Sequence, residues 1–252
     1  MNKKLLQFAS MLLMVVCLCV NFTACDDDDE DSTTGTTNGY AWVDLGLPSG
    51  LKWATCNVGA ENPWEYGDYF AWGETAPKSV YDLSTYLDGR ITEYRDCGTD
   101  NDLLNGITDI KGTKYDVVRA NMGKKWRMPT FAECQELLRE CDWVWTEDYN
   151  GISVKGYIVY KRKNENFYSS LYGVPSSPYS ISDTHIFLPA TGWLYGSSLD
   201  FAGSACYYWS SSLEDGSMDA YCIFAGWIDF YTNHYMKYQP REFGMTVRGV
   251  CE

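Results

Sequence analysis

The chain has 252 residues and a formal net charge of −14, because 34 acidic residues outnumber 20 basic ones. So acidic a protein is a poor partner for nucleic acid or for an anionic membrane face, and we expect neither kind of binding. The chain has only two histidines, and no Cys-x-x-Cys pair follows Cys25. The composition therefore gives no support to a zinc site, and we expect no metal and no cofactor.

The first 24 residues have the pattern of a secretory signal peptide. Two lysines precede the apolar run Met11–Val20, which is too short to span a bilayer as a permanent helix, and a small residue precedes Cys25. The segment Phe22–Cys25 resembles a bacterial lipobox. This resemblance implies that Cys25 becomes the mature N-terminus and that its acyl chains hold the protein on a membrane. Ordinary secretion, with Cys25 as a spare thiol, fits the same pattern.

Residues 25–38 are expected to form a flexible tether. The six carboxylates of Asp26–Asp31 repel one another and cannot fold, and Ser32–Asn38 adds small polar residues. An acidic cluster after a lipidated cysteine resembles the surface-export signal of lipoproteins in Bacteroides-type bacteria. It implies an outer-membrane protein whose folded part faces the extracellular side. A plain linker explains the same composition.

The remaining chain, Gly39–Glu252, is expected to form one domain, because no proline- or serine-rich linker divides it. Two strands, Tyr40–Gly46 and Leu51–Cys56, are predicted around a turn at Pro48–Gly50. Residues 76–114 show no sustained period and predict a long irregular region.

The clearest helix begins after Thr130. Glu133 follows three residues later, so the two side chains form a capping box in which each satisfies a backbone N–H at the helix start. Four apolar residues then recur at helical spacing and predict one buried stripe: Cys134, Leu137, Leu138 and Cys141.

Strand-like runs dominate after this helix. Trp143–Thr146 and Ile152–Lys161 flank Asn150-Gly151, which is a strong hairpin signal. Two further strand-like runs, Ile186–Trp193 and Phe243–Val250, stand alone in the sequence. Another two, Cys206–Ser211 and Ala220–Phe224, flank the turn Glu214–Gly216 and predict a second hairpin.

The predicted hairpin around Glu214–Gly216 determines whether Cys206 and Cys222 could form a disulfide. A turn centred near Asp215 places Tyr208 opposite Cys222, with Cys206 on the same face but one step diagonal. Diagonal neighbours lie about 7–8 Å apart, whereas a disulfide needs Cα atoms within about 7 Å. We therefore expect no Cys206–Cys222 bond in this register, although a one-residue change or a bulge would permit it.

The aromatic content is high, with 10 Trp, 20 Tyr and 10 Phe, and it favours a strand-rich fold with many turns. Most of these rings are expected in the core. Two late segments, Trp193–Gly203 and Trp227–Gln239, are predicted to be loops that bind a ligand. Their rings could stack on a pyranose and their polar groups could donate or accept hydrogen bonds: Trp193, Tyr195, Trp227, Tyr231 and Tyr235, with Asp200, Asp229 and Asn233.

Several segments together resemble one known family. They are Leu47–Gly59, Trp126–Thr130, Phe187–Gly192, Tyr208–Ser212 and Gly244–Arg248. They are similar to the Fibrobacter succinogenes major paralogous domain of secreted proteins and lipoproteins of Bacteroidetes. The resemblance implies an α+β, C-type-lectin-like fold, with twisted, mostly antiparallel strands, few helices, long irregular loops and neighbouring termini. This fold is shared with the formylglycine-generating sulfatase-modifying enzymes, but the resemblance implies no chemistry for this chain.

Calcium-dependent sugar binding and catalysis both find little support. The segment Gln239-Pro240-Arg241 places a cation where the lectin signature has a carboxylate or amide, and Asp100-Asn101-Asp102 is explained equally well as a polar loop. Formylglycine-generating catalysis needs a reactive cysteine pair, and neither Cys222 nor Cys251 has a basic neighbour assured by the sequence. The sequence therefore predicts a non-catalytic module that binds an extracellular glycan or protein. The alternatives are a structural or adhesin subunit of the cell envelope and, third, an enzyme.

Overall fold

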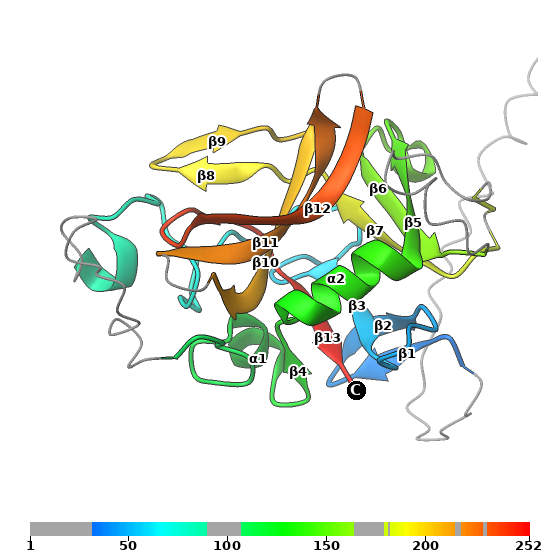
Figure 1. The fold of residues 1–252 in the computed structure, drawn as a ribbon, viewed down its shortest axis with the longest axis horizontal. Helices are drawn as coiled ribbons and strands as arrows, with labels where there is room; N and C mark the ends of the chain where they lie inside the picture. Colours follow the sequence, from blue (N-terminus) through cyan, green and yellow to red (C-terminus); the bar gives the residue numbers. More distant parts are fainter. Residues whose placement is uncertain (1–31, 90–106, 164–178, 181, 215–217, 229–230) are drawn as a thin grey trace, which may run out of the picture. The chain divides into compact units, whose positions relative to one another are not determined.

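Antiparallel strands make up most of the fold (Figure 1). The computed structural model describes residues 32–89, 107–163, 179–180, 182–214, 218–228 and 231–252. Within them the chain is a β-rich α+β fold with few helices, as the sequence predicts at this level of detail. Among these described residues, no helix is both long and apolar enough to cross a membrane.

A five-stranded sheet brings the beginning and the end of the described chain together. Its order is β1 (Thr34–Thr37), β2 (Tyr40–Asp44), β3 (Lys52–Asn57), β13 (Arg248–Cys251) and β4 (Trp126–Arg127). The predicted turn between β2 and β3 is confirmed, since the two strands pair antiparallel. The C-terminal strand β13 lies between β3 and β4 (Figure 1).

The expected tether differs from the structure at its C-terminal end. Thr34–Thr37, expected to be flexible, form β1 and pair with β2 through a turn at Asn38-Gly39. Both turn residues have positive φ angles, 51° and 81°, which is the conformation of a two-residue hairpin turn. The Asn-Gly pair was the sequence signal for this hairpin, and the folded part therefore begins before Gly39.

A three-stranded sheet follows the helix. It contains β5 (Cys141–Thr146), β6 (Gly156–Lys161) and β7 (His185–Pro189) in that order. The predicted hairpin around Asn150-Gly151 is confirmed, with β5 and β6 antiparallel. A short 3-10 turn, η3 (Tyr149–Gly151), widens its loop.

A second three-stranded sheet is built from β10 (Ala205–Leu213), β11 (Asp219–Ile228) and β12 (Tyr231–Pro240). The segment expected as a late loop, residues 227–239, is therefore mostly strand. A two-stranded hairpin, β8 (Trp193–Tyr195) and β9 (Ser198–Asp200), occupies the other expected loop.

The register of β10 and β11 corrects the expected pairing by one residue. Trp209, not Tyr208, lies opposite Cys222, and the pairing shifts again between Trp209 and Leu213. Because side chains alternate between the two faces of a strand, Cys206 and Cys222 lie on opposite faces. This separation excludes a bond between them in this structure, and the six described cysteines after Cys25 are all free.

This sheet separates two hydrophobic cores. Alternate residues of β10 and β11 enter the first core, and the residues between them enter the second. The first contains Tyr207, Trp209, Cys222 and Phe224, and the second contains Cys206, Tyr208, Ile223 and Ala225. The stripe predicted on the helix is confirmed, since Cys134, Leu137, Leu138 and Cys141 are all buried in the second core.

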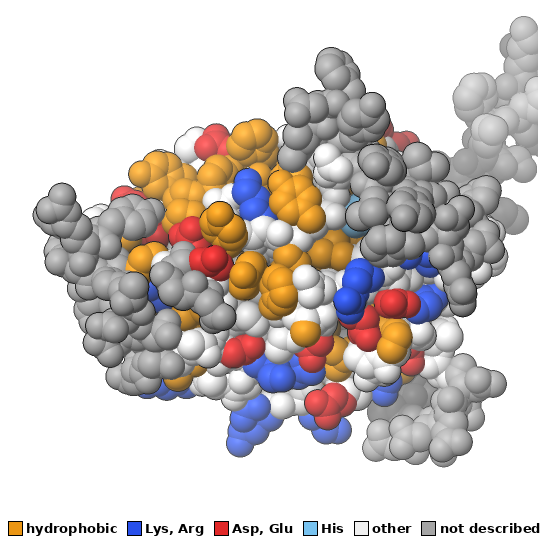
Figure 2. Space-filling model, in the orientation of Figure 1, with side chains coloured by type: hydrophobic (Ala, Val, Ile, Leu, Met, Phe, Trp, Pro, Cys, Tyr) orange, Lys and Arg blue, Asp and Glu red, His pale blue; other side chains and the backbone are white. Residues whose placement is uncertain are grey.

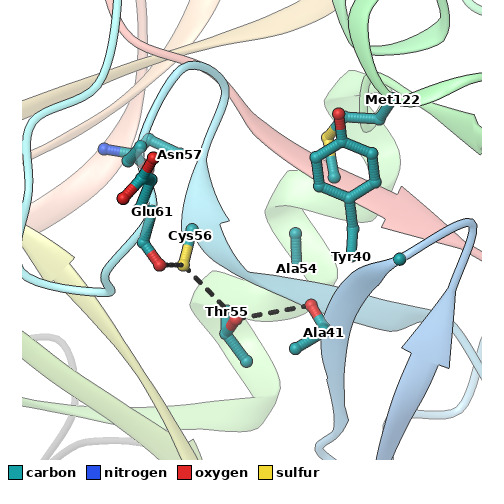
Figure 3. Close-up of a pocket in the computed structure, with 10 residues that line it drawn as sticks. Tyr40, Ala41, Ala54, Thr55, Cys56, Asn57, Glu61 and Met122 are labelled. Carbon is teal, nitrogen blue, oxygen red and sulfur yellow. Dashed lines mark hydrogen bonds between the residues drawn. The ribbon is translucent and has the colours of Figure 1, made fainter.

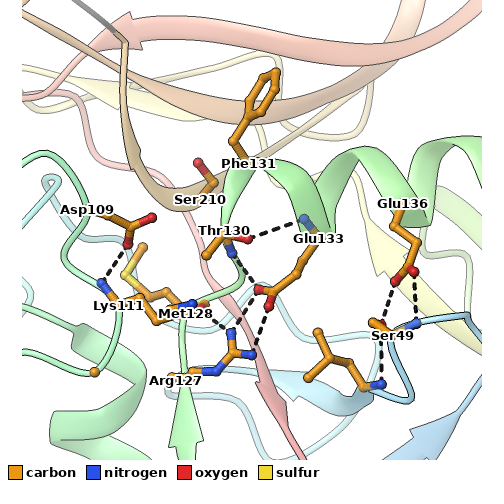
Figure 4. Close-up of polar contacts among 12 residues, drawn as sticks. Ser49, Asp109, Lys111, Arg127, Met128, Thr130, Phe131, Glu133, Glu136 and Ser210 are labelled. Atoms are coloured by element: carbon orange, nitrogen blue, oxygen red, sulfur yellow. Dashed lines mark hydrogen bonds and ion pairs between the residues drawn. The ribbon is translucent and has the colours of Figure 1, made fainter.

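The helices are short: η1 (Tyr86–Gly89), α1 (Val117–Met122) and α2 (Phe131–Glu140). The predicted capping box of α2 is confirmed, and Arg127 adds two hydrogen bonds of 2.8 Å to the Glu133 carboxylate (Figure 4). One turn along α2, Glu136 accepts the backbone N–H of Ser49 at 2.9 Å (Figure 4). These contacts tie α2 to β4 and to the turn between β2 and β3.

Replacing Thr130 by alanine is expected to lower the free energy of unfolding by about 1 kcal/mol, because the Glu133 N–H then loses its side-chain acceptor. Thr130→Ser keeps the hydroxyl and should stay close to wild type. Urea unfolding followed by circular dichroism measures both. Equal losses in the two variants would contradict the role given to the hydroxyl.

A buried hydrogen-bond network joins four of the five sequence segments that carry the family resemblance. Arg248 donates from Nε to Asn57 Oδ1 at 2.8 Å and from Nη2 to the Phe187 carbonyl at 2.9 Å. Asn57 Nδ2 donates to the Tyr208 hydroxyl at 3.3 Å. The same hydroxyl donates to the Pro189 carbonyl at 2.9 Å. These segments therefore hold β3, β7, β10 and β13 together.

Candidate functional site

The β8–β9 hairpin brings together three of the predicted binding residues. Trp193 lies directly opposite Asp200, and Tyr195 opposite Ser198. Residues at alternate positions share a face of a hairpin, so Trp193, Tyr195 and Asp200 lie on one side of it. Ser198 Oγ donates to Asp200 Oδ1 at 3.3 Å, and both residues are exposed.

Trp193 is the centre of this group. Its ring stacks on Tyr207 of β10, with centroids 5.6 Å apart, and meets the edge of Phe243 at 4.4 Å. Phe243 also contacts Tyr195 at 5.1 Å. The indole N–H of Trp193 is buried and has no hydrogen-bond partner among the described residues. The hairpin is thus attached to the first core through rings, and one donor is left unused.

Ring contacts continue from Trp193 across the sheet. Tyr207 contacts Phe224 at 5.2 Å, and Phe224 contacts Tyr235 of β12, also at 5.2 Å. On the other side, Phe201 lies 6.4 Å from Trp193. We call these seven rings the aromatic face: Trp193, Tyr195, Phe201, Tyr207, Phe224, Tyr235 and Phe243.

Three rings of the aromatic face are open to solvent. Tyr195 is 55% exposed, Phe201 57% and Tyr235 41%. Figure 2 shows hydrophobic side chains gathered over β8, β9 and the upper part of β12, with a basic side chain among them. Exposed aromatic groups that are clustered, and rimmed by polar residues, are typical of binding surfaces.

Phe201 combines a left-handed backbone conformation with an exposed ring. Phe201 has a φ of 60°, a left-handed conformation that is rare for a bulky residue and costs about 1–3 kcal/mol. Gly192, at the base of the hairpin, has a φ of 62°, and a Cβ there would clash with the Asp200 carbonyl. An exposed phenylalanine on strained backbone adds little to stability, which favours a role in binding.

The predicted residues of the second segment divide into two groups. Tyr235 belongs to the aromatic face, and half-buried Asn233 lies on the same face of β12, opposite Gly226. The side chains of Trp227, Asp229 and Tyr231 lie outside the described residues. Cys25, the predicted lipid attachment site, also lies outside them.

The sequence interpretation missed three members of the site. Phe201, Phe243 and Lys237 were not selected, yet Phe201 and Phe243 contact Trp193 and Lys237 lies over Tyr207 and Phe224. The alternating pattern of β12 was the available signal for Lys237, because residues 233, 235 and 237 share one face of a strand.

The two cysteines considered for catalysis lie in the protein interior. Cys222 and Cys251 are buried, and burial raises the pKa of both thiols above their usual value. A raised pKa disfavours the thiolate that a reactive cysteine requires. Cys97 lies outside the described residues.

The segment Gln239-Pro240-Arg241 has a packing role. Gln239 and Arg241 are both buried, and Arg241 donates from Nε to the Met218 carbonyl at 2.7 Å. Its guanidinium lies 6.0 Å from the centre of the Trp72 ring. Across the described part of the chain, no three His, Cys, Asp or Glu side chains come close enough to hold a metal ion. Asp100-Asn101-Asp102 lies outside that part.

A cavity of about 350 Å³ opens between β2, β3 and the end of α1 (Figure 3). The Tyr40 hydroxyl donates to the Asn121 carbonyl at 3.0 Å on one side, and the Cys56 thiol donates to the Glu61 carbonyl at 3.5 Å on the other. No aromatic-face residue lines it. Its lining offers one carboxylate and no basic group, so it lacks the paired charges of an acid–base site.

The aromatic face is therefore the candidate site, with Asp200, Ser198 and Asn233 as its polar neighbours. Comparisons of the chain with protein-family models, with curated proteins and with solved structures found no match, so its function is inferred from this geometry and from the sequence motifs.

Proposed function

We propose that this protein is a non-catalytic binding module that recognises an extracellular glycan through the aromatic face. The observation that carries the proposal is the continuous set of ring contacts that ends in three exposed rings, Tyr195, Phe201 and Tyr235. Rings present a flat apolar surface with little conformational entropy to lose, which suits the apolar face of a sugar ring. Asp200 and Asn233 can hydrogen bond to hydroxyl groups at the edge.

The sequence motifs support the wider setting of the proposal. We propose that the domain is C-type-lectin-like and related to the Fibrobacter major paralogous domain. The β-rich fold and the position of β13 between β3 and β4, which brings the two ends of the described chain into one sheet, support this assignment. The lipobox-like segment before Cys25 and the acidic run after it support a lipid anchor in the outer membrane, with the domain on the extracellular side.

The proposal predicts that Tyr195→Ala weakens glycan binding about tenfold or more, because an exposed ring at the centre of contact is lost. Purified full-length protein is applied to a glycan array, with calcium and with EDTA, and the affinity of the best ligand is measured by calorimetry.

Tyr238→Ala is the matched control for this experiment. Tyr238 is also 55% exposed, but it lies on the opposite face of β12 from Tyr235. It should change the affinity less than about twofold. Equal losses in the two variants, or no binding to any glycan, would overturn the proposal.

A protein partner is the second candidate, as in an adhesin or envelope assembly. The observation in its favour is that Leu199, on the other face of the hairpin opposite Leu194, is 43% exposed, and that neither Leu199 nor Phe201 offers a polar group to a sugar. In that case no glycan binds. Phe201→Asp, but not Tyr238→Asp, then removes the protein from high-mass complexes on native gels of envelope extracts.

A further inference from the structure

One cation lies against the aromatic face. Lys237 is in β12, opposite Cys222, and shares a face of the strand with Asn233 and Tyr235. Its Nζ lies 5.6 Å from the centre of the Tyr207 ring and 5.4 Å from that of Phe224. Lys237 is therefore the positive group among the rings proposed to bind a glycan.

The ammonium group of Lys237 has no anionic partner in the described part of the chain. Lys78, Lys155, Lys161 and Lys163 each pair with a carboxylate within 4.0 Å, whereas Lys237 and five further described lysines form no ion pair with a described carboxylate. Among these unpaired lysines, Lys237 is the one that lies over two rings of the aromatic face. A ring face attracts a cation weakly and takes up none of its three N–H donors. These donors remain available to a ligand.

The position of Lys237 favours a ligand that combines a sugar ring with an anion. A neutral sugar that covers the rings would remove water from the ammonium without replacing its hydrogen bonds, which opposes binding. A carboxylate would instead form a charge-assisted hydrogen bond there. Without the leader and the acidic run the chain carries −10, from 18 basic and 28 acidic residues, so long-range attraction would not favour an anion. Selection has to come from a local cation.

Asp200 limits how much negative charge the ligand can carry. Two rings lie between Asp200 and Lys237. Trp193 lies opposite Asp200 in the hairpin and stacks on Tyr207, and Lys237 lies over Tyr207. A second anion at Asp200 would be repelled, whereas a hydroxyl there can donate a hydrogen bond. From this pattern we propose that the aromatic face selects glycans with a carboxylated sugar, a uronic acid, whose carboxylate binds Lys237. The inference rests on the proposed glycan-binding function.

The test compares each acidic sugar with its own neutral form. An array carries uronic-acid oligomers of several polysaccharides beside their methyl esters, which keep the ring and remove the charge. Full-length wild-type protein should bind the best acid at least about tenfold more tightly than its ester. Lys237→Gln should reduce this preference to less than about twofold, and Lys237→Arg should retain it.

Tyr195→Ala separates this inference from the proposed function. It should weaken the binding of acid and ester by the same factor, because it removes ring contact and no charge. If wild type binds acid and ester equally, or if Lys237→Gln keeps the preference, the uronic-acid inference is wrong, while a loss in Tyr195→Ala still supports glycan binding. If neither form binds, the uronic-acid inference is wrong, and the proposed function is then decided by the general glycan array described above.

Discussion

Replacing Arg248 by methionine is expected to lower the free energy of unfolding by about 3–5 kcal/mol. The guanidinium is 1% exposed and donates to Asn57 Oδ1 and to the carbonyls of Ala54, Thr55 and Phe187. Methionine fills much of the volume but removes the donor that these four acceptors share, three of them in buried hydrogen bonds. Such orphaned groups cost more than the original hydrogen bonds gained.

Arg248 also differs from a buried ion pair. Among the described residues no carboxylate forms an ion pair with it, and burial lowers the pKa of its guanidinium below the usual value. Its charge is stabilised by carbonyl dipoles from β3 and β7, which come from distant parts of the sequence. Removing the side chain therefore weakens the attachment of β13 to both strands.

The measurement is urea unfolding of wild type, Arg248→Met, Arg248→Lys and Arg139→Met. Lysine keeps the charge but lacks the planar fork, so we expect an intermediate loss that remains measurable if the methionine variant does not fold. Arg139 is exposed on α2, so the same substitution there should change stability by no more than about 0.5 kcal/mol. Equal midpoints for Arg248→Met and wild type would contradict the argument.

Local signals predicted the elements that depend on neighbouring residues. Thr130 and Glu133 identified the start of α2, and Asn150-Gly151 identified the β5–β6 hairpin. These signals are short-range, because a cap or a tight turn is decided by three or four consecutive residues. The same kind of signal at Asn38-Gly39 was present but was outweighed by the flexible composition around it.

Register was not predictable in the same way. The observed partner of Cys222 is Trp209, one residue away from the expected Tyr208, and this difference places Cys206 in the other core. A bulge depends on what packs on each face of the sheet. β12 was likewise expected as a loop, whereas it forms a ten-residue strand paired with β11.

The candidate site was predictable within one hairpin and not across the sheet. Trp193, Tyr195 and Asp200 are close in sequence, and the structure places them on one face. The contact of Phe243 with Trp193 joins residues 50 positions apart, and that of Lys237 with Tyr207 joins residues 30 positions apart, which no local pattern reveals. Four of the five segments that carry the family resemblance have a different role, because they meet in the buried network of Arg248 and specify packing.

Lowering the pH from 7.5 to 5.0 is expected to cost the fold about 1–2 kcal/mol through His234 alone. Burial, reinforced by Arg162, lowers the pKa of this histidine to about 4, whereas nearby Asp142 acts in the opposite direction. In the unfolded chain the pKa is about 6.5. The unfolded state therefore binds more protons between these two values, and stability is lost as the pH falls from about 6.5 towards 4.

The environment of His234 explains why the neutral ring is required. The ring stacks on Trp143 with centroids 5.1 Å apart, and within the described part of the chain its buried Nδ1 has no hydrogen-bond partner. Arg162, the nearby cation, is already paired with Asp142 at 3.2 Å, so a proton on His234 would add a second positive charge beside a satisfied ion pair. The stack with Trp143 offers too little attraction to offset that cost.

His234→Phe keeps the stacked ring and removes the titration. Urea unfolding of wild type and this variant at pH 7.5 and 5.0 isolates the histidine, because the carboxylates common to both proteins cancel in the difference. The variant should lose about 1–2 kcal/mol less than wild type over this interval. Equal losses would show that other groups carry the acid sensitivity. A larger loss in the variant would mean that protonated His234 stabilises the fold, which requires a pKa above 6.5 in the folded state and would contradict the buried, cation-flanked position described for it.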